Sequence, residues 1–395
     1  MSKIILYFIF ICIITSCNYR GEVDHKLINF KVVKNVEIPL NARIQYNHSQ
    51  IQSIDSCTII GLDRKFQKLD IYTICEEKLL SSINFDDEGP NRIYPINSFY
   101  YLSKDSIFLY SSDASTFQLI DSTAQVLNEW RLFDNKYVEP LSDTIIGGNG
   151  KYYPFSHTQN GLFNFPFLYD RINGNPIIQV MPASELAGFG NRKTIYNAPI
   201  LARVNLNSGS FEDFQGRWPK NYLEEKAPSN PFVHLSQSHD SSNVLLTYFN
   251  SDLIFSTKND KFLEMPSKYF DDRYTLFSIN ENADYTTEEE LGAYHNDEGY
   301  VNLVYNPYRG LYYRIAKHAN EQTDAERLHR MESAWSIIVF NEQFEILGEA
   351  LMPEKTYNFL QILPAARGLL ISKENSYSPT NKEEIYEFDL IEMDL

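Results

Sequence analysis

The chain has 395 residues and carries 52 acidic against 35 basic side chains, which gives a formal net charge of −17 at pH 7. A body this acidic repels phosphate backbones, so we expect no nucleic-acid partner. No apolar run beyond the first sixteen residues approaches the length of a membrane-spanning helix, so we expect no membrane-spanning segment there.

Residues 1–16 have the pattern of a secretory signal peptide, with Lys3 followed by an apolar run from Ile4 to Ile14. The segment Ile14-Thr15-Ser16-Cys17 resembles a lipobox, in which small residues admit the peptidase and the cysteine thiol accepts a diacylglyceryl group. An ordinary signal peptide that happens to contain a cysteine is the alternative. We predict a signal peptide over 1–16, lipidation of Cys17, and a polar tether over 17–26.

Two cysteines remain free to pair in an oxidising compartment, Cys57 and Cys75, because the signal and the lipid account for the others. They fall in neighbouring predicted strands of one hairpin. With a turn at residues 63–65, Cys57 would face residues 71–73, which leaves Cys75 out of register. This register favours two separate buried thiols, although the alternative of a disulfide stays open.

Short apolar and aromatic runs, separated by Asp, Asn, Gly, Ser and Pro, fill residues 27–395. The 27 Tyr and 26 Phe, with many β-branched residues, favour strands throughout. Helical patterns are few, and the clearest are 286–294 and 322–333. We therefore expect an all-β domain.

A hairpin pattern repeats along this domain, in which a strand ends in Asp or Asn and a polar turn leads to a second strand. The turns at Asp121, Asn207, Asn259 and Asn341 suit tight hairpins. The copies are KFQKLDIYTI with EKLLSSINF, TFQLID with QVLNEWRLF, ILARVNLN with SFEDF, DLIFSTKN with KFLEM, SIIVFN with FEILGEALM, and a final EIYEFDLIEM without a partner.

The spacing of these hairpins predicts six units. The turns lie 46 residues apart from Cys75 to Asp121, 52 from Asn207 to Asn259, and 51 from Asn341 to Glu392 near the chain end. The remaining intervals, 86 and 82 residues, equal one such period plus an insertion. Two further strands precede each hairpin, and four antiparallel strands per repeat are typical of a propeller blade.

The last blade lacks a fourth strand, while LINFKVVKNVEI, residues 27–38, is a strand without a partner. Pairing the two closes the ring and removes both free edges. A β-sandwich is the alternative, and it leaves both strands unexplained. We predict a six-bladed β-propeller over 27–395, closed by pairing the N-terminal strand with the C-terminal blade.

Two segments resemble a known family. Asp87-Glu88-Gly89-Pro90-Asn91-Arg92, followed by Tyr94 and Pro95, resembles the Gly-Pro connector between blades in the TolB-like, six-bladed propeller lipoproteins of Bacteroidetes, which include a family known only as a domain of unknown function. The segment YNPYRGLYYR, residues 305–314, is similar to a late-blade hairpin of that family. The resemblance implies a fold and a location in the cell envelope, and no chemistry.

The same resemblance bears on localisation and modification. Asn18 is not the aspartate associated with inner-membrane retention, which favours the outer membrane, and YRGEVD is too weakly acidic to match the surface-export signal of Bacteroidetes, so the membrane side stays open. Three sites, Ser106, Ser122 and Thr144, each follow an aspartate in the pattern used for O-glycosylation of exported proteins in such bacteria.

Motifs with a defined chemistry are missing from the sequence, including a nucleophile elbow, a zinc helix and a phosphate loop. Gly147–Lys151 is glycine-rich but has no helix after it, which indicates a tight loop. His234 and His239 would lie on opposite faces of a strand, and His318 and His329 are eleven residues apart. We expect no metal and no cofactor.

Loop lengths indicate where a ligand would bind. In a propeller, loops between strands two and three and connectors between blades open on one face, and both insertions, 158–198 and 319–332, fall there. The long connectors 135–141 and 266–298 join them. We predict that Arg92, His157, Arg314 and His318 converge on this face, the alternative being that the arginines only pair with surface acids.

For function, we favour a membrane-anchored binding module for a glycan, peptide or protein. The alternative is a propeller-fold hydrolase or lyase acting on a polysaccharide or peptide. Assembly with an outer-membrane complex is a third option. A cluster of carboxylates or histidines with shifted pKa values in the channel would favour an enzyme, and a broad aromatic and arginine surface would favour a binder.

Overall fold

The structure is a computed structural model. It describes residues 25–39, 48–63, 65–111, 114, 116–132, 152–154, 167–182, 192–223, 233–238, 243–270, 298–319, 332–373 and 385–395. The signal peptide, Cys17 and both predicted helical segments, apart from residues 332–333, lie outside these ranges. Among the described residues, no helix is long and apolar enough to cross a membrane.

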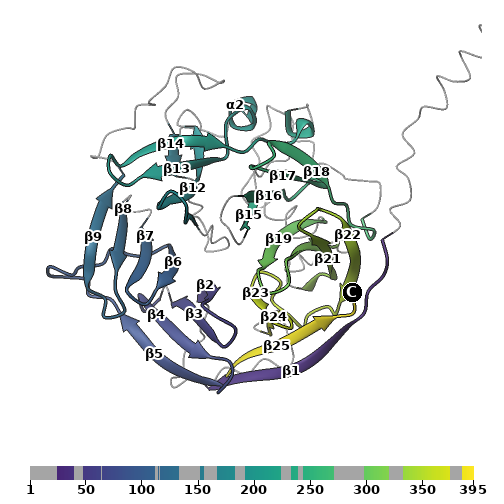
Figure 1. Cartoon of the computed structure of the whole chain (residues 1–395), viewed down its shortest axis with the longest axis horizontal. Coiled ribbons are helices and arrows are strands. Elements are labelled where there is room, and N and C mark those ends of the chain that lie inside the picture. The colour runs from purple at the N-terminus through teal and green to yellow at the C-terminus, as the bar shows by residue number, and fades with distance from the viewer. Residues whose placement is uncertain are drawn as a thin grey trace, which may run out of the picture.

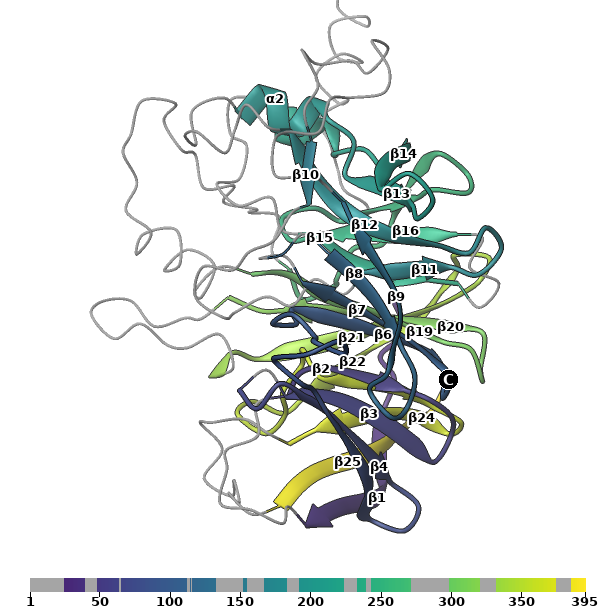
Figure 2. The same cartoon turned by 90° about the vertical axis from the view of Figure 1, so that its left-hand side faces the viewer.

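Six antiparallel sheets are arranged around a central axis as the blades of a propeller (Figure 1). Each sheet runs from an inner strand near this axis to an outer strand on the rim. This confirms the predicted all-β fold with six blades of four antiparallel strands, to which blade three adds one short extra strand. Figure 2 shows the same disc from the side, with β1 (Phe30–Pro39) and β25 (Ile385–Met393) together at one end.

The blades follow one another in chain order. Blade one contains β2 (His48–Ser53), β3 (Thr58–Asp63), β4 (Lys68–Thr73) and β5 (Lys78–Asn84), and blade two contains β6 (Ser98–Ser103), β7 (Ser106–Ser111), β8 (Thr116–Ile120) and β9 (Val126–Arg131). Blade three contains β10 (Tyr152–Pro154), β11 (Leu168–Asp170), β12 (Asn175–Pro182), β13 (Leu201–Asn205) and β14 (Ser210–Gln215), with the helices α2 (Arg192–Asn197) and η2 (Lys220–Leu223) beside it.

Blade four contains β15 (Val233–Gln237), β16 (Val244–Tyr248), β17 (Leu253–Ser256) and β18 (Lys261–Glu264). Blade five contains β19 (Gly299–Asn306), β20 (Leu311–Lys317), β21 (Trp335–Asn341) and β22 (Ile346–Met352). Blade six contains β23 (Ile362–Ala365), β24 (Gly368–Ser372), β25 (Ile385–Met393) and, from the other end of the chain, β1 (Phe30–Pro39).

The ring closes as predicted, through β1 and β25. They pair antiparallel from Phe30 opposite Met393 to Pro39 opposite Ile385. Val36 and Ile38 of β1 are buried and pack into a hydrophobic cluster shared by blades six and one. The closing strand therefore supplies both a ladder of backbone hydrogen bonds and part of the core.

Blade three differs from the prediction. An insertion over 158–198 between strands two and three would make the strand before it the second strand of the blade. That strand, β10, is instead the innermost one, because it pairs only with β12. The second strand, β12, lies inside the segment 158–198 that we interpreted as an insertion. The loop between strands two and three is therefore confined to residues 183–200, and it contains α2.

Cys57 and Cys75 form a disulfide, which corrects the interpretation as separate buried thiols. The hairpin turn extends to residue 67, since Asp63 pairs with Lys68. This register places Cys57 opposite Ile74, whose amide donates to the Cys57 carbonyl at 2.8 Å. The two cysteine Cα atoms are then 5.2 Å apart, and Cys75 is exposed rather than buried.

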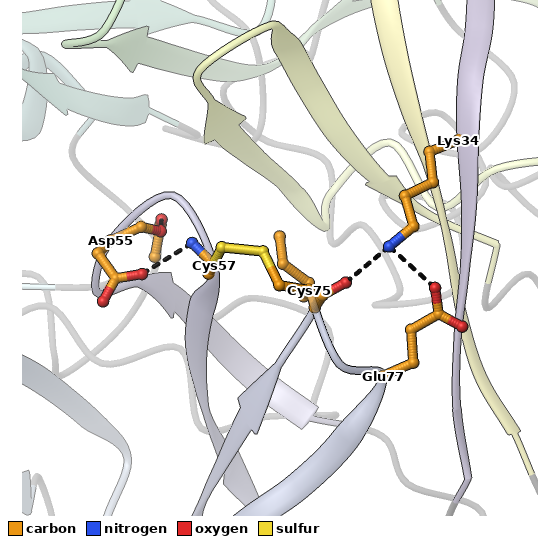
Figure 3. The surroundings of a disulfide bond; sticks show 7 residues. Lys34, Asp55, Cys57, Cys75 and Glu77 are labelled. Atoms are coloured by element: carbon orange, nitrogen blue, oxygen red, sulfur yellow. Dashed lines mark hydrogen bonds and ion pairs between the residues drawn. A yellow bond between two sulfur atoms is a disulfide. The ribbon is translucent and has the colours of Figure 1, made fainter.

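The disulfide lies beside the closing strand, as Figure 3 shows. Lys34 of β1 donates to the Ile74 carbonyl at 3.1 Å and forms an ion pair with Glu77 at 2.9 Å. Both partners belong to the β4–β5 turn that contains Cys75. The cross-link therefore constrains the turn of blade one against which the closing strand is held.

Side-chain amides join the inner strands of blades one and two. Gln50 donates to the Phe99 carbonyl at 2.8 Å and accepts from the Phe99 amide at 2.9 Å and from the Ser98 hydroxyl at 3.0 Å. Gln52 forms the same pair of bonds with the backbone of Tyr101, at 3.0 and 2.8 Å. A glutamine side-chain amide carries the same donor and acceptor as a peptide group. Each glutamine therefore makes the pair of hydrogen bonds that the backbone of a neighbouring strand would make.

Candidate functional site

Two faces of the disc follow from the strand directions. Strands one and three run one way and strands two and four the other, so the blade connectors and the loops between strands two and three share one face. We call it the connector face; among the described residues it includes 85–97, 249–252, 265–270, 318–319 and 332–334. The opposite face carries the remaining hairpin turns, and we call it the turn face.

Arg92 lies on the connector face between blades one and two. Its side chain is exposed, and its guanidinium carbon is 5.0 Å from the centre of the Tyr94 ring. The loop turns at Gly89, which has a positive φ of 86°, and the Ile93 amide donates to the Asp86 carbonyl at 2.8 Å. The Gly-Pro connector is therefore a compact turn that presents Arg92 to solvent.

Arg314 is a structural residue rather than a surface cation. It is completely buried in β20, with its guanidinium carbon 3.3 Å from the centre of the Tyr300 ring. Arg314 donates five hydrogen bonds to blade four, to Thr247 Oγ1 (2.7 Å) and the carbonyls of Asp252 (2.7 Å), Met265 (2.6 Å), Ser251 (2.6 Å) and Leu253 (3.2 Å). Arg314 thus fastens blade five to blade four.

His318 ends the segment after β20 on the connector face and is half-buried. Its Nε2 atom is 2.9 Å from the Ser336 hydroxyl, and its ring is 5.2 Å from the ring of Tyr269 and 6.1 Å from that of Phe270. Burial, with a smaller effect from the charge of Lys317, lowers the pKa of His318 to about 4. The imidazole is therefore neutral at pH 7.

Glu349 of β22 is the centre of a buried network beneath His318. It is fully buried and accepts hydrogen bonds from the hydroxyls of Ser336 (2.5 Å) and Ser267 (2.6 Å) and from the Lys268 amide (2.8 Å). Ser336 has one proton and gives it to Glu349, so His318 Nε2 must donate to Ser336. The Nδ1 atom of His318 is then an acceptor.

This arrangement is not a nucleophile with its base. Ser336 is completely buried, so no substrate can reach it, and Glu349 contacts the serine instead of orienting the histidine. Within the described residues, no group of three or more His, Cys, Asp or Glu side chains could hold a metal ion. The chemistry offered at this site is therefore a hydrogen-bond acceptor beside an aromatic ring.

The structure does not bring the predicted site residues together. Because the blades follow in order around the ring, Arg92 at blades one and two lies opposite His318 and Arg314 at blades four and five (Figure 1). His157 lies outside the described residues. Arg92 and His318 share the connector face, but they do not share a site.

The predicted glycosylation sites lie on the turn face. Ser106 begins β7 and is half-buried, and Ser122 is exposed in the β8–β9 turn. Since Ile107 pairs with Ile120, the two sites end neighbouring strands of blade two. Thr144 lies outside the described residues.

Tyr269, Ser336 and Glu349 were not predicted as site residues from the sequence. One signal could have indicated Glu349, because it is the single acidic residue within the otherwise apolar and small β22 sequence ILGEALM. A carboxylate buried in such a strand needs several donors. Tyr269 and Ser336 have no comparable signal, since aromatic residues and serines are frequent throughout the chain.

The fold defines the chain as a six-bladed β-propeller. A family model described as a domain of unknown function (DUF4221) matches residues 28–351, and the chain belongs to this family. This confirms the resemblance to the Bacteroidetes propeller family. None of the curated proteins matches the sequence.

Two solved structures have a similar fold. A DUF4221 member from Bacteroides vulgatus has a TM-score of 0.71 at 16% identity, over 94% of this chain and 99% of that one. A candidate exported protein from Bacteroides fragilis has a TM-score of 0.55 at 10% identity, over 94% of this chain and 98% of that one. At these identities the likeness establishes the fold alone.

Proposed function

We propose that this protein is a lipid-anchored propeller that binds a glycan on its connector face, at His318 and Tyr269. The observation that supports this best is the fixed, neutral imidazole of His318. It offers Nδ1 as an acceptor to a hydroxyl group, while the adjacent Tyr269 ring offers an apolar face with a polar tip. A neutral acceptor suits an uncharged, hydroxyl-rich ligand better than an anion.

The buried network supports the site by making it rigid. Glu349, Ser336 and Ser267 fix the imidazole, and the Lys268 amide fixes the loop that carries Tyr269. Groups that are already held in place lose little conformational entropy when a ligand binds, so less of the binding free energy is spent on ordering the site.

Attachment to the membrane is the second part of the proposal. It rests on the lipobox-like segment Ile14-Thr15-Ser16-Cys17, which would place the propeller in the cell envelope with Cys17 acylated. Metabolic labelling with a fatty acid tests it directly: the wild-type chain should carry label, and Cys17→Ala should yield an unlabelled precursor. Label that persists on the variant would place the anchor elsewhere.

A glycan and peptide array tests the binding function. The probe is the mature chain with Cys17→Ser, and the informative variants are Tyr269→Ala and His318→Phe, which keeps the ring contact but removes Nδ1. The control is Tyr94→Ala, a half-buried tyrosine on the same face at the opposite side of the ring.

We expect the chain with the unchanged site to bind glycans. Each site variant should weaken this binding on the order of tenfold, as for the loss of one or two good contacts, and the control should leave it unchanged. Binding of peptides alone would change the ligand class. Glycan binding that survives both site variants would refute the site.

A further inference from the structure

Exposed apolar side chains concentrate at one part of the rim. Among the described residues, nine large hydrophobic side chains are exposed: Leu27, Val32, Phe66, Leu80, Leu127, Ile172, Tyr308, Leu351 and Leu395. Two of them, Leu27 and Val32, belong to the N-terminal segment. The backbones of Glu349 and Asp394 form hydrogen bonds with this segment. Leu351 follows Glu349 by two residues, and Leu395 directly follows Asp394. We call these four residues the anchor-side rim.

The N-terminal segment is held firmly in this position. It extends blade five by a short parallel pairing in which the Ile28 amide donates to the Glu349 carbonyl (3.1 Å) and the Glu349 amide donates to the Lys26 carbonyl (3.0 Å). The neighbouring residue is Gly348, and a Cβ atom there would lie 2.6 Å from the Lys26 oxygen. The rim strand β22 thus leaves room for this segment where a side chain would block it.

The loop after β18 fixes the start of the segment. The His25 ring is 2.9 Å from the Pro266 carbonyl, and the Lys268 ammonium donates to the His25 carbonyl at 3.3 Å. The described chain therefore begins at the rim between blades four and five. Cys17 precedes His25 by eight residues, so the Cα atoms of the two residues can lie no further than about 28 Å apart.

The charge at this rim is close to balanced, unlike the strongly acidic chain as a whole. Lys26 is exposed, Lys31 forms ion pairs with Glu392 (3.2 Å) and Asp394 (4.0 Å), and Lys34 pairs with Glu77. Anionic lipid would therefore be repelled less here than elsewhere on a molecule of net charge −17.

We infer that the anchor-side rim rests on the lipid surface, so that the disc meets the membrane with the outer edge of blades five and six. The inference rests on the proposed acylation of Cys17. The short tether holds this edge near the bilayer, and four half-exposed apolar side chains then gain by leaving water. In this orientation the disc stands on its edge, so the connector face points sideways, away from the lipid, and stays accessible to a ligand.

The test uses the acylated protein in vesicles that contain a lipid with a nitroxide on its headgroup. A fluorophore is attached to Leu351→Cys or, in a second protein, to Leu127→Cys. The two leucines are matched, since they are 49% and 48% exposed on outer strands of blades five and two, which lie opposite each other in the ring. The native Cys57–Cys75 disulfide leaves no other thiol in the described residues.

We expect strong quenching at position 351 and on the order of tenfold less at position 127, because nitroxide quenching requires close approach. Adding Leu27→Asp to the labelled Leu351→Cys protein should reduce quenching, since a carboxylate resists entry into the interface. Equal quenching at 351 and 127 in a protein that carries fatty-acid label would overturn the orientation alone. Absence of the label would overturn the anchor and, with it, the orientation.

Discussion

At the scale of single residues, His318 links stability to pH. Its folded pKa is about 4, below the ordinary value of 6.5, so between these values the unfolded chain binds a proton that the folded chain does not. Stability must therefore fall as the pH is lowered through this window. At about 1.4 kcal/mol per pKa unit, we expect a loss of about 2 kcal/mol between pH 7.5 and 5.

Urea unfolding at the two pH values measures this loss, with His318→Gln as the comparison. The pKa values of Asp121, Asp170 and Glu392 are lowered, so the stability that these carboxylates contribute changes only below the ordinary pKa of a carboxyl group. These groups therefore do not obscure the effect of His318. The variant should show a flatter profile. The same pH dependence in both proteins would mean that another group is responsible.

Gln50 should contribute more to stability than an exposed glutamine. Gln50→Ala removes three hydrogen bonds between blades one and two and leaves the backbone of Phe99 without these partners, so we expect a loss of about 2–3 kcal/mol. Gln125→Ala is the control, because this side chain is exposed in a turn. Denaturant titration should leave the control within about 0.5 kcal/mol of wild type.

The turn residues show how far single residues could be predicted from the sequence. Asp121 and Asn341 accept turn amides with their side chains, as expected of Asp and Asn in hairpins. In blade three the accepting side chain is Asn205, and Asn207 supplies an amide instead. Composition indicates that a turn is present, whereas the identity of the capping residue depends on the register of the strands.

At the scale of elements, the disulfide should stabilise blade one and, through Lys34, the closing strand. The bond spans 18 residues, and the loop-entropy relation for that length gives about 3 kcal/mol. Thermal unfolding with and without reductant measures the effect. Wild type should lose stability on reduction, while the double variant Cys57→Ser and Cys75→Ser should be insensitive. An unchanged melting temperature in reduced wild type would contradict this.

Elements were predictable where the strands are long and regularly spaced, and less so elsewhere. The hairpins of blades one, two, four and five lie where the sequence pattern placed them, because each pairs two apolar runs across a short polar turn. In blade three, β10 and β11 have three residues each, too few for a period-two pattern. The order of its strands could therefore not be derived from periodicity.

At the scale of the whole molecule, the period of the repeat and two unpaired end strands were sufficient to predict a closed six-bladed ring. The candidate site was not predictable in the same way. Arg92 and His318 share a face because blade connectors and loops between strands two and three open on the same side of the disc. The distance between them depends on which blades carry them. The burial of Arg314 arises from contacts between blades four and five, and such contacts leave no local pattern in the sequence.

Strand β1 closes the ring, and thermal unfolding of a chain that lacks residues 27–38 tests this closure most directly. Val32→Asp, at a 48% exposed position of the same strand, is the control for the presence of a new charge, and Ile38→Asp, at a fully buried position, is the matched core variant. We predict that the deletion and Ile38→Asp abolish cooperative unfolding or lower the melting temperature sharply, because the loss of a ladder and a buried apolar side chain leaves blade six open. A deleted chain that unfolds cooperatively at the wild-type temperature would contradict the account.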